Sequence, residues 1–264
     1  METVAVATYA GPAGDHNDRA MAQVGLVGEA LAHRLGAPGL VVGSPAPADP
    51  QSWDVELARC GGSLREMAEC IDQVMASGAV PISAITRCAV ALATLPVVLR
   101  HRPDAVVVWL DAHGDINVPA DSRTRYLGGM AFSGPMGWWD SGLGAGLPAT
   151  QAILVGARDL DPTEATHVAA GAITLVEGGE GLRERLTSVI AGRPAYLHLD
   201  CDVLQPGLIR TDYTVPGGLT LEDVHSCAEV AATSEVLGLE IGEFEGEGSA
   251  TIHDLLDALG PVLP

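Results

Sequence analysis

An apolar run at residues 105–110 leads directly into polar side chains that could bind a metal ion. Asp111, His113, Asp115 and Asn117 follow it at every second position. Because alternate residues of an extended segment point to the same side, these side chains are expected to share one face. Carboxylates and an imidazole buried together are costly unless a cation neutralises them. The pattern predicts a metal site at a strand end; a capping network that leads into the next helix is the structural alternative.

A second set of polar residues follows the apolar run at residues 195–199. Asp200 and Asp202 are expected on one face, and Cys201 between them points the other way. Alone, this pattern fits two aspartates that cap a turn. Together with the first set it supplies oxygen and nitrogen ligands for hard divalent ions, and Mn²⁺ with an imidazole ligand fits. Two such ions about 3.5 Å apart would share a water molecule and acidify it into a nucleophile.

The order of these residues resembles a known family. Asp-Ala-His-Gly-Asp-Ile-Asn followed by Asp-Cys-Asp is similar to the signature pair of the arginases, or ureohydrolases. The resemblance covers nearly the whole chain and implies two Mn²⁺ ions per chain. It makes Asp111 and Asp200 bridging ligands. It assigns Asp115 to the first ion, and His113 and Asp202 to the second. It also implies that Asp115 acts as the general base.

Two further motifs resemble the parts of arginases that hold the substrate. The segment GLEIGEFE is similar to the strand whose glutamate pairs with the substrate guanidinium, which points to Glu243. The segment RDLDPTE resembles a loop in which Asp161 and Glu164 would hold the α-ammonium group, and Asn117 matches a residue that contacts the α-carboxylate. The implied partner is a small guanidino amino acid. The alternative is an ordinary helix start, with Asp-Pro at the N-terminus and Glu in the first turn.

The chain departs from the family pattern at two positions. Most members carry a histidine ligand of the first ion where this chain has Cys88, in the segment ITRCA. We expect the Cys88 thiolate to bind that ion, although a thiolate is a softer ligand than manganese prefers; an ordinary buried thiol is the alternative. The family's acid/base histidine is replaced by Gly128 in YLGG, and no neighbouring residue obviously replaces it.

These departures resemble one branch of the family, the Nω-hydroxy-L-arginine hydrolases of D-cycloserine biosynthesis. The shared features are Thr-x-Cys at the ligand position, Tyr-Leu-Gly-Gly-Met, and Trp-Asp-Ser-Gly followed by Gly-Ala-Gly. The resemblance implies release of hydroxyurea and L-ornithine, or of urea from arginine or a related guanidino acid, and a role in antibiotic biosynthesis. An N-hydroxyguanidine is less basic than a guanidinium, so it can react uncharged, and its own N–OH can assist proton transfer.

Two other functions are compatible with the same residues. A mononuclear zinc amidohydrolase of the deacetylase type would use only Asp111, His113 and Asp202. A catalytically silent binding protein would keep the fold without the reaction. Metal content separates the three hypotheses: two manganese ions, one zinc ion, or little bound metal.

The elements that would position these residues form an α/β pattern. Eight short strands, several of them apolar without alternation, alternate with helices. This predicts one arginase-like domain over residues 1–264, a three-layer αβα fold with a mostly parallel eight-stranded sheet. The expected strands are Thr3–Ala7, Leu40–Val42, Ala79–Ser83, Ala105–Leu110, Ala152–Val155, Ala172–Val176, Ala195–Leu199 and Val236–Ile241.

The first two helices have the clearest predicted ends. The first is expected from Asp18 to Leu35, with Asn17 as its N-cap and Gly36 after its end. The second is expected over residues 62–77, after a loop at residues 44–54. A glycine-rich loop is expected at residues 128–150.

Composition excludes several classes of function. Among 264 residues, 14 are basic and 34 acidic, the net charge is −20, and every basic residue is arginine. This charge opposes nucleic acids and anionic membranes, and the absence of lysine excludes a Walker loop and a pyridoxal Schiff base. No secretory signal or membrane span is visible, and five cysteines without paired spacing favour a reducing cytoplasm. The family's C-terminal trimer segment is not recognisable, which favours a monomer.

Overall fold

The computed structural model describes residues 3–263, in which eight strands form one parallel sheet. The strand order is β2-β1-β3-β8-β7-β4-β5-β6, and every neighbouring pair is parallel. The predicted three-layer fold and all eight strands are confirmed. Their bounds are β1 Val4–Tyr9, β2 Gly39–Val42, β3 Val80–Ile85, β4 Val106–Leu110, β5 Ala152–Val155, β6 Thr174–Val176, β7 Ala195–Asp200 and β8 Val236–Gly242.

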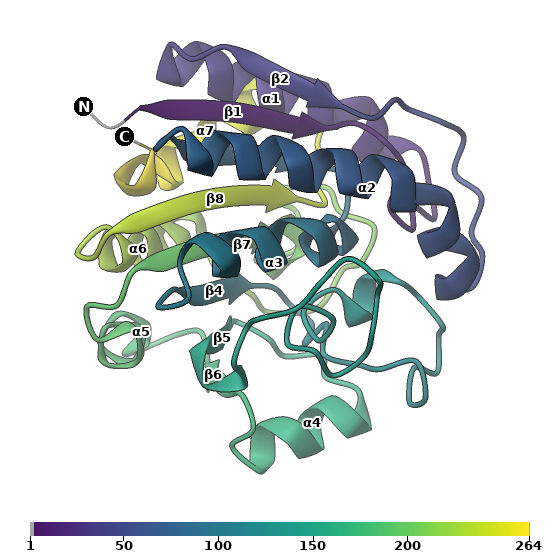
Figure 1. Ribbon diagram of the computed structural model, residues 1–264. Coiled ribbons are helices and arrows are strands. Elements are labelled where there is room, and N and C mark those ends of the chain that lie inside the picture. The colour runs from purple at the N-terminus through teal and green to yellow at the C-terminus, as the bar shows by residue number, and fades with distance from the viewer. Residues whose placement is uncertain (1–2, 264) are drawn as a thin grey trace.

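Helices cover both faces of this sheet (Figure 1). Helices α2 and α3 pack on one face, and α1, α5, α6 and α7 pack on the other. Helix α4 lies near the β6 edge. The helix bounds are α1 Arg19–Leu35, α2 Trp53–Ala76, α3 Ala91–His101, α4 Pro162–Ala169, α5 Leu182–Ile190, α6 Leu221–Ala231 and α7 Ser249–Ala258.

The central strands are apolar because both of their faces are covered. In β4, Val106, Val108 and Leu110 pack on the side of α1, whereas Val107 and Trp109 pack on the side of α2. All five side chains are buried. A strand with two covered faces has no solvent side to mark with polar residues, which explains why its sequence does not alternate.

Two helix starts differ from the prediction. Helix α2 begins at Trp53, after Ser52, well before the predicted start at Gly62. Packing of α2 against α3 and β3 outweighs the poor helix propensity of the Gly61-Gly62 pair. Helix α1 is flanked by Asp18, and Asn17 lies one position earlier, where its side chain accepts a hydrogen bond from the Arg19 N–H at 2.8 Å. Gly36 ends α1 in the left-handed conformation, as predicted.

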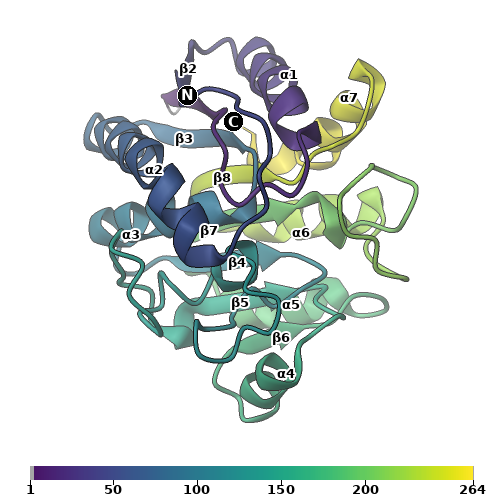
Figure 2. The ribbon, with the colours of Figure 1, turned by 90° about the vertical axis from the view of Figure 1, so that its right-hand side faces the viewer.

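The carboxyl ends of the strands all meet at one edge of the sheet, which faces the viewer in Figure 2. In the sheet, β3, β8, β7 and β4 are consecutive, so the segments that follow these four strands lie side by side. Ligands of open α/β sheets bind at such an edge. None of the helices within residues 3–263 combines the length and apolar character that crossing a bilayer requires.

Candidate active site

Four neighbouring strands deliver the predicted metal ligands and the predicted guanidino-binding glutamate to one place. Asp111 directly follows β4, and Asp200 is the last residue of β7, the neighbour of β4. Glu243 follows β8, which pairs with β7 through Gly242 and Asp200. Cys88 lies just beyond β3, in a short 3₁₀ turn that opens α3. Residues from distant parts of the sequence therefore converge because of the strand order.

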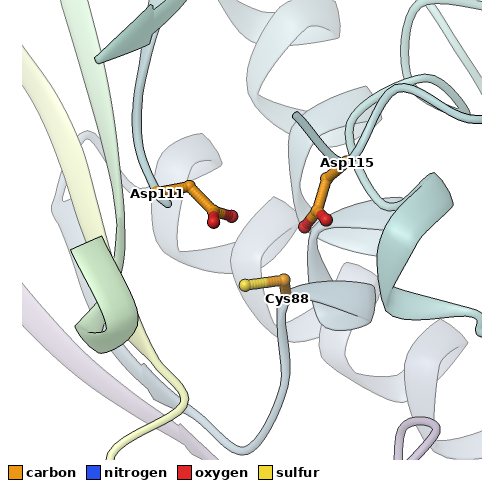
Figure 3. A group of neighbouring side chains, drawn as sticks. All are labelled: Cys88, Asp111 and Asp115. Carbon is orange, nitrogen blue, oxygen red and sulfur yellow. The ribbon is translucent and has the colours of Figure 1, made fainter. Parts of the chain in front are cut away.

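A thiol and two carboxylates form the first group of possible ligands. The Sγ atom of Cys88 and carboxylate oxygens of Asp111 and Asp115 all lie within 4.8 Å of one another. Figure 3 shows that these three side chains point toward each other. Asp200 and Glu243 form another such group with the same thiol, and Asp200 Oδ2 lies 3.1 Å from Cys88 Sγ. The thiol of Cys88 thus lies among the carboxylates with which the sequence predicted it to bind a metal ion.

The second group of possible ligands is built around His113. Its Nδ1 atom lies 3.0 Å from Asp202 Oδ2 and 3.4 Å from Asp111 Oδ1, and the three residues meet the same 4.8 Å criterion. Backbone hydrogen bonds fix the carboxylates. Asp202 Oδ1 accepts the Ala112 N–H at 3.1 Å, and Asp200 Oδ1 accepts the Asp202 N–H at 2.7 Å. Asp111 belongs to both groups, as a bridging ligand must.

The electrostatics of these carboxylates suit bound cations. Burial, together with the charges of Asp202 and Asp111, raises the pKa of Asp200 well above its usual range. Burial and the charge of Asp111 do the same to the pKa of Asp115, and they also raise the pKa of Asp202. Buried carboxylates that repel one another are stabilised by a divalent ion. The donor set of carboxylates, one imidazole and one thiol therefore fits the predicted pair of metal ions.

Two site residues have strained backbones. Asp115 and Glu243 adopt positive φ angles of 52° and 57°, in the left-handed region that non-glycine residues rarely occupy. Tertiary hydrogen bonds hold both conformations. The Asp115 carbonyl accepts the Phe132 N–H at 2.9 Å, and the Glu243 N–H donates to the Thr86 carbonyl at 3.3 Å. Such strain is typical of functional positions, where the fold orients a side chain against local preference.

The residues expected to bind the amino-acid end of a substrate lie together. Asn117 Nδ2 donates to Asp161 Oδ2 at 2.9 Å, while the buried Asn117 Oδ1 has no hydrogen-bond partner among residues 3–263. Both carboxylate oxygens of Glu164 are used in backbone hydrogen bonds: they accept the N–H groups of Ile116 at 3.0 Å and Asp161 at 2.9 Å. Burial raises the pKa of Glu164 to about 7. Asp161 and Asn117 are therefore better placed than Glu164 for direct contact with a ligand.

One cavity of about 230 Å³ connects these groups. All predicted site residues except Asp111 line it, and so do Tyr126 and Tyr213, which sequence analysis did not assign to the site. The ring of Tyr126 also explains Gly128, the position of the missing histidine. A Cβ atom on Gly128 would lie only 2.5 Å from Tyr126 Cε1 and 2.8 Å from its hydroxyl oxygen. The space beside Gly128 is therefore occupied by a tyrosine from two positions earlier.

A buried histidine contacts Cys88, and a buried glutamate binds that histidine in turn. His198 Nε2 lies 3.1 Å from Cys88 Sγ, and His198 Nδ1 lies 2.7 Å from Glu240 Oε1. The imidazole is stacked on Trp109, with ring centroids 3.5 Å apart and planes 3° apart. This pair was not predicted from the sequence. The sequence does place a histidine and a glutamate inside apolar strands, and such polar side chains need buried partners.

The structure also reveals a fully buried arginine beside the site. Arg87 donates to Asp15 Oδ1 at 2.8 Å, to Glu245 Oε1 at 3.0 Å, and to Glu243 Oε2. Burial lowers the pKa of the Arg87 guanidinium, but Glu243 and the other carboxylates outweigh this effect and raise it. Burial raises the pKa of Glu243 to about 7, against the opposing effect of Arg87. The carboxylate expected to bind a substrate guanidinium thus already binds an internal one.

A parallel αβα sheet that carries buried carboxylates, an imidazole and a thiol at its carboxyl edge defines an α/β enzyme, and comparison with known proteins identifies its family. A family model described as "Arginase family" matches residues 43–249. The N(omega)-hydroxy-L-arginine amidinohydrolase of Streptomyces lavendulae is 36% identical over 237 residues, which cover 88% of this chain and 87% of that protein.

The arginase of Bacillus caldovelox is similar in sequence and in structure. It is 28% identical over 188 residues, 65% of this chain and 63% of that arginase. Its solved structure has a TM-score of 0.84 at 21% identity and covers 100% of this chain and 98% of that one. The chain belongs to the arginase family. The predicted family, fold and enzyme class, a hydrolase acting on C–N bonds of linear amidines, are confirmed.

Proposed function

We propose that the protein is a binuclear manganese hydrolase whose substrate is Nω-hydroxy-L-arginine, which it converts to hydroxyurea and L-ornithine. The main support is the convergence of two groups of ligand atoms that share Asp111, beside a cavity lined by Asp161 and Asn117. The similarity to the S. lavendulae amidinohydrolase supports the choice of substrate.

The residues that line the cavity have different roles in this reaction. Two divalent ions, when bound, supply an acidified water molecule and neutralise the carboxylates. Asp115 is buried and lines the cavity, so its carboxylate can accept the proton that the attacking water loses. Glu243 holds the guanidino group, while Asp161 and Asn117 hold the amino-acid end, which fixes the position of the reacting carbon.

The leaving nitrogen of L-ornithine must gain a proton. No histidine stands at position 128 to donate it. We assign the transfer to Asp115, which passes on the proton taken from water as the C–N bond breaks. The hydroxyl of an N-hydroxyguanidine can assist this proton transfer, because it lies on the same guanidino group whose C–N bond breaks.

We place this activity in the cytoplasm and in antibiotic biosynthesis, and propose a monomer as the working unit. The five cysteines support a reducing compartment, since none of them forms a disulfide.

The test is a product assay with Mn²⁺-loaded protein. Nω-hydroxy-L-arginine, L-arginine and agmatine are supplied separately, and hydroxyurea, urea and the amine product are quantified. We expect hydroxyurea and L-ornithine from the first substrate and a much lower kcat/KM for the other two. Agmatine as the best substrate would refute the amino-acid assignment, and a single zinc ion in the active protein would favour the mononuclear alternative.

A further inference from the structure

Arg87 holds one oxygen of the glutamate that faces the guanidino group. Its side chain is 0% exposed; Asp15 binds its Nε atom and Glu245 its Nη2 atom, whereas Glu243 binds Nη1. The Asn17 carbonyl also accepts from it, at 3.4 Å. Arg87 follows β3 and Glu243 follows the neighbouring strand β8. The strand order therefore brings the pair together, and two further carboxylates hold the guanidinium in place.

The contact changes what Glu243 can offer a substrate. Because Arg87 binds Oε2, the other oxygen, Oε1, is left for the cavity, and the Cys88 N–H already approaches it at 3.4 Å. A guanidinium binds a carboxylate best through two parallel hydrogen bonds, which need both oxygens. Its positive charge would also have to share that carboxylate with the buried Arg87 guanidinium. Two like charges on one carboxylate repel each other, which disfavours binding of the second.

We propose that Arg87 is a specificity-determining residue that makes this site select an uncharged N-hydroxyguanidine over a protonated guanidinium. The inference rests on the proposed function and adds the reason for its substrate preference. The electron-withdrawing hydroxyl makes the N-hydroxyguanidine far less basic than the guanidinium of arginine, which stays protonated in proteins. A neutral group needs only one acceptor oxygen, and Oε1 can supply it without bringing a second positive charge next to Arg87. The Arg87–Glu243 ion pair therefore weakens the binding of arginine more than the binding of Nω-hydroxy-L-arginine.

The first test measures binding to the wild-type protein. Calorimetry compares L-arginine with L-citrulline, which has nearly the same shape but carries an uncharged ureido group. We expect L-citrulline to bind more tightly than L-arginine at neutral pH. Tighter binding of L-arginine, or no binding of either compound, would overturn the proposal. This comparison needs no turnover, so it can fail or succeed independently of whether hydroxyurea is formed.

The second test changes Arg87 itself. Arg87→Met keeps the length and removes the charge, whereas Arg87→Lys keeps the charge; Arg100→Met, at an exposed arginine paired with Asp72, is the matched control. The readout is the ratio of kcat/KM for Nω-hydroxy-L-arginine to that for L-arginine in Mn²⁺-loaded protein. We expect Arg87→Met to lower this ratio by about tenfold or more, and the other two variants to keep most of it. An unchanged ratio in a folded Arg87→Met protein would contradict the proposal, and should that variant fail to fold, the wild-type comparison still decides.

Discussion

The thiol of Cys88 contacts the groups that determine whether it ionises. Burial and the nearby charges of Asp200 and Asp111 raise its pKa well above the usual range. Only a thiolate ligates a metal strongly, so the cation that neutralises the carboxylates also favours ionisation of Cys88. The substitution of histidine by cysteine is therefore compatible with a complete site, provided that the ions are bound.

We predict that Cys88→Ala loses one of two metal ions. Asp111, His113 and Asp202 still form the second ligand group, so the site with His113 should stay occupied. Cys88→His should keep both ions, because imidazole is a good ligand for manganese. Metal content per chain measured on purified proteins is the readout, and Cys227→Ala, at a buried cysteine of α6 in the hydrophobic core, is the control. Two ions per chain and full activity in Cys88→Ala would show that Cys88 is not a ligand.

Substitution of Asp161 should weaken substrate binding and leave the rate of the bound substrate's reaction nearly unchanged. We predict that Asp161→Ala raises the KM for Nω-hydroxy-L-arginine by roughly tenfold, since a hydrogen bond to a charged group contributes about 1.5–3 kcal/mol. The kcat should change little, because this contact is equal in the ground and transition states. The deamino analogue, which has no α-ammonium group, should be hydrolysed equally well by both proteins. A similar KM increase with the analogue would mean that Asp161 acts only by supporting the loop.

At the scale of elements, Arg158 ties the segment after β7 to the site. Its guanidinium donates to the backbone carbonyls of Asp202 at 3.1 Å, Val203 at 3.2 Å, Val215 at 3.1 Å and Pro216 at 3.2 Å. One side chain thus satisfies carbonyls at both ends of a long irregular segment. It also fixes the backbone of Asp202, whose carboxylate faces His113.

We predict that Arg158→Met destabilises the protein by about 1–3 kcal/mol, because carbonyls lose their donors. The segment from 204 to 218 should also become sensitive to limited proteolysis. Urea denaturation and peptide mapping measure the two effects. Arg185→Met is the control, since Arg185 also donates to backbone carbonyls, of Glu177 and Glu180, but lies at an exposed helix start. An equal loss of stability in both variants would mean that Arg158 contributes no more than an exposed arginine does.

The elements were largely predictable from sequence, and their contacts were not. Apolar strands were recognisable because burial on both faces excludes polar residues, and strand-end motifs gave Asp111 and Asp200 directly. The start of α2 was missed because tertiary packing overrides the local propensity of Gly61-Gly62. Arg87 escaped notice for a related reason. Nothing local shows that the residue before Cys88 is buried among carboxylates from positions 15, 243 and 245.

At the scale of the whole molecule, charge links stability to pH and to metal. The chain carries a net charge of −20, and burial raises the pKa of both Glu164 and Glu243 to about 7. A carboxyl group with a pKa raised on folding binds its proton more tightly in the folded state than in the unfolded state. Its contribution to stability is therefore present below the unfolded pKa and is lost as pH rises through about 7.

We predict opposite pH trends for the metal-free and the Mn²⁺-loaded protein. Without metal, the melting temperature should fall between about pH 5 and pH 7, because the unfolded state releases the protons of these carboxyl groups more readily than the folded state does. With Mn²⁺ it should rise over the same range, because ligands must be deprotonated to bind. An ion present at 100 times its Kd adds about 2.7 kcal/mol of stability.

Calorimetric melting with chelator or with excess Mn²⁺ measures both trends. The double variant Asp111→Asn with Asp200→Asn, which removes the charges of the two predicted bridging ligands, should abolish the rise with Mn²⁺. Parallel trends in the two states of the wild type would mean that these carboxylates do not hold the ions, and that the charge crowded at the carboxyl edge of the sheet is balanced by other means.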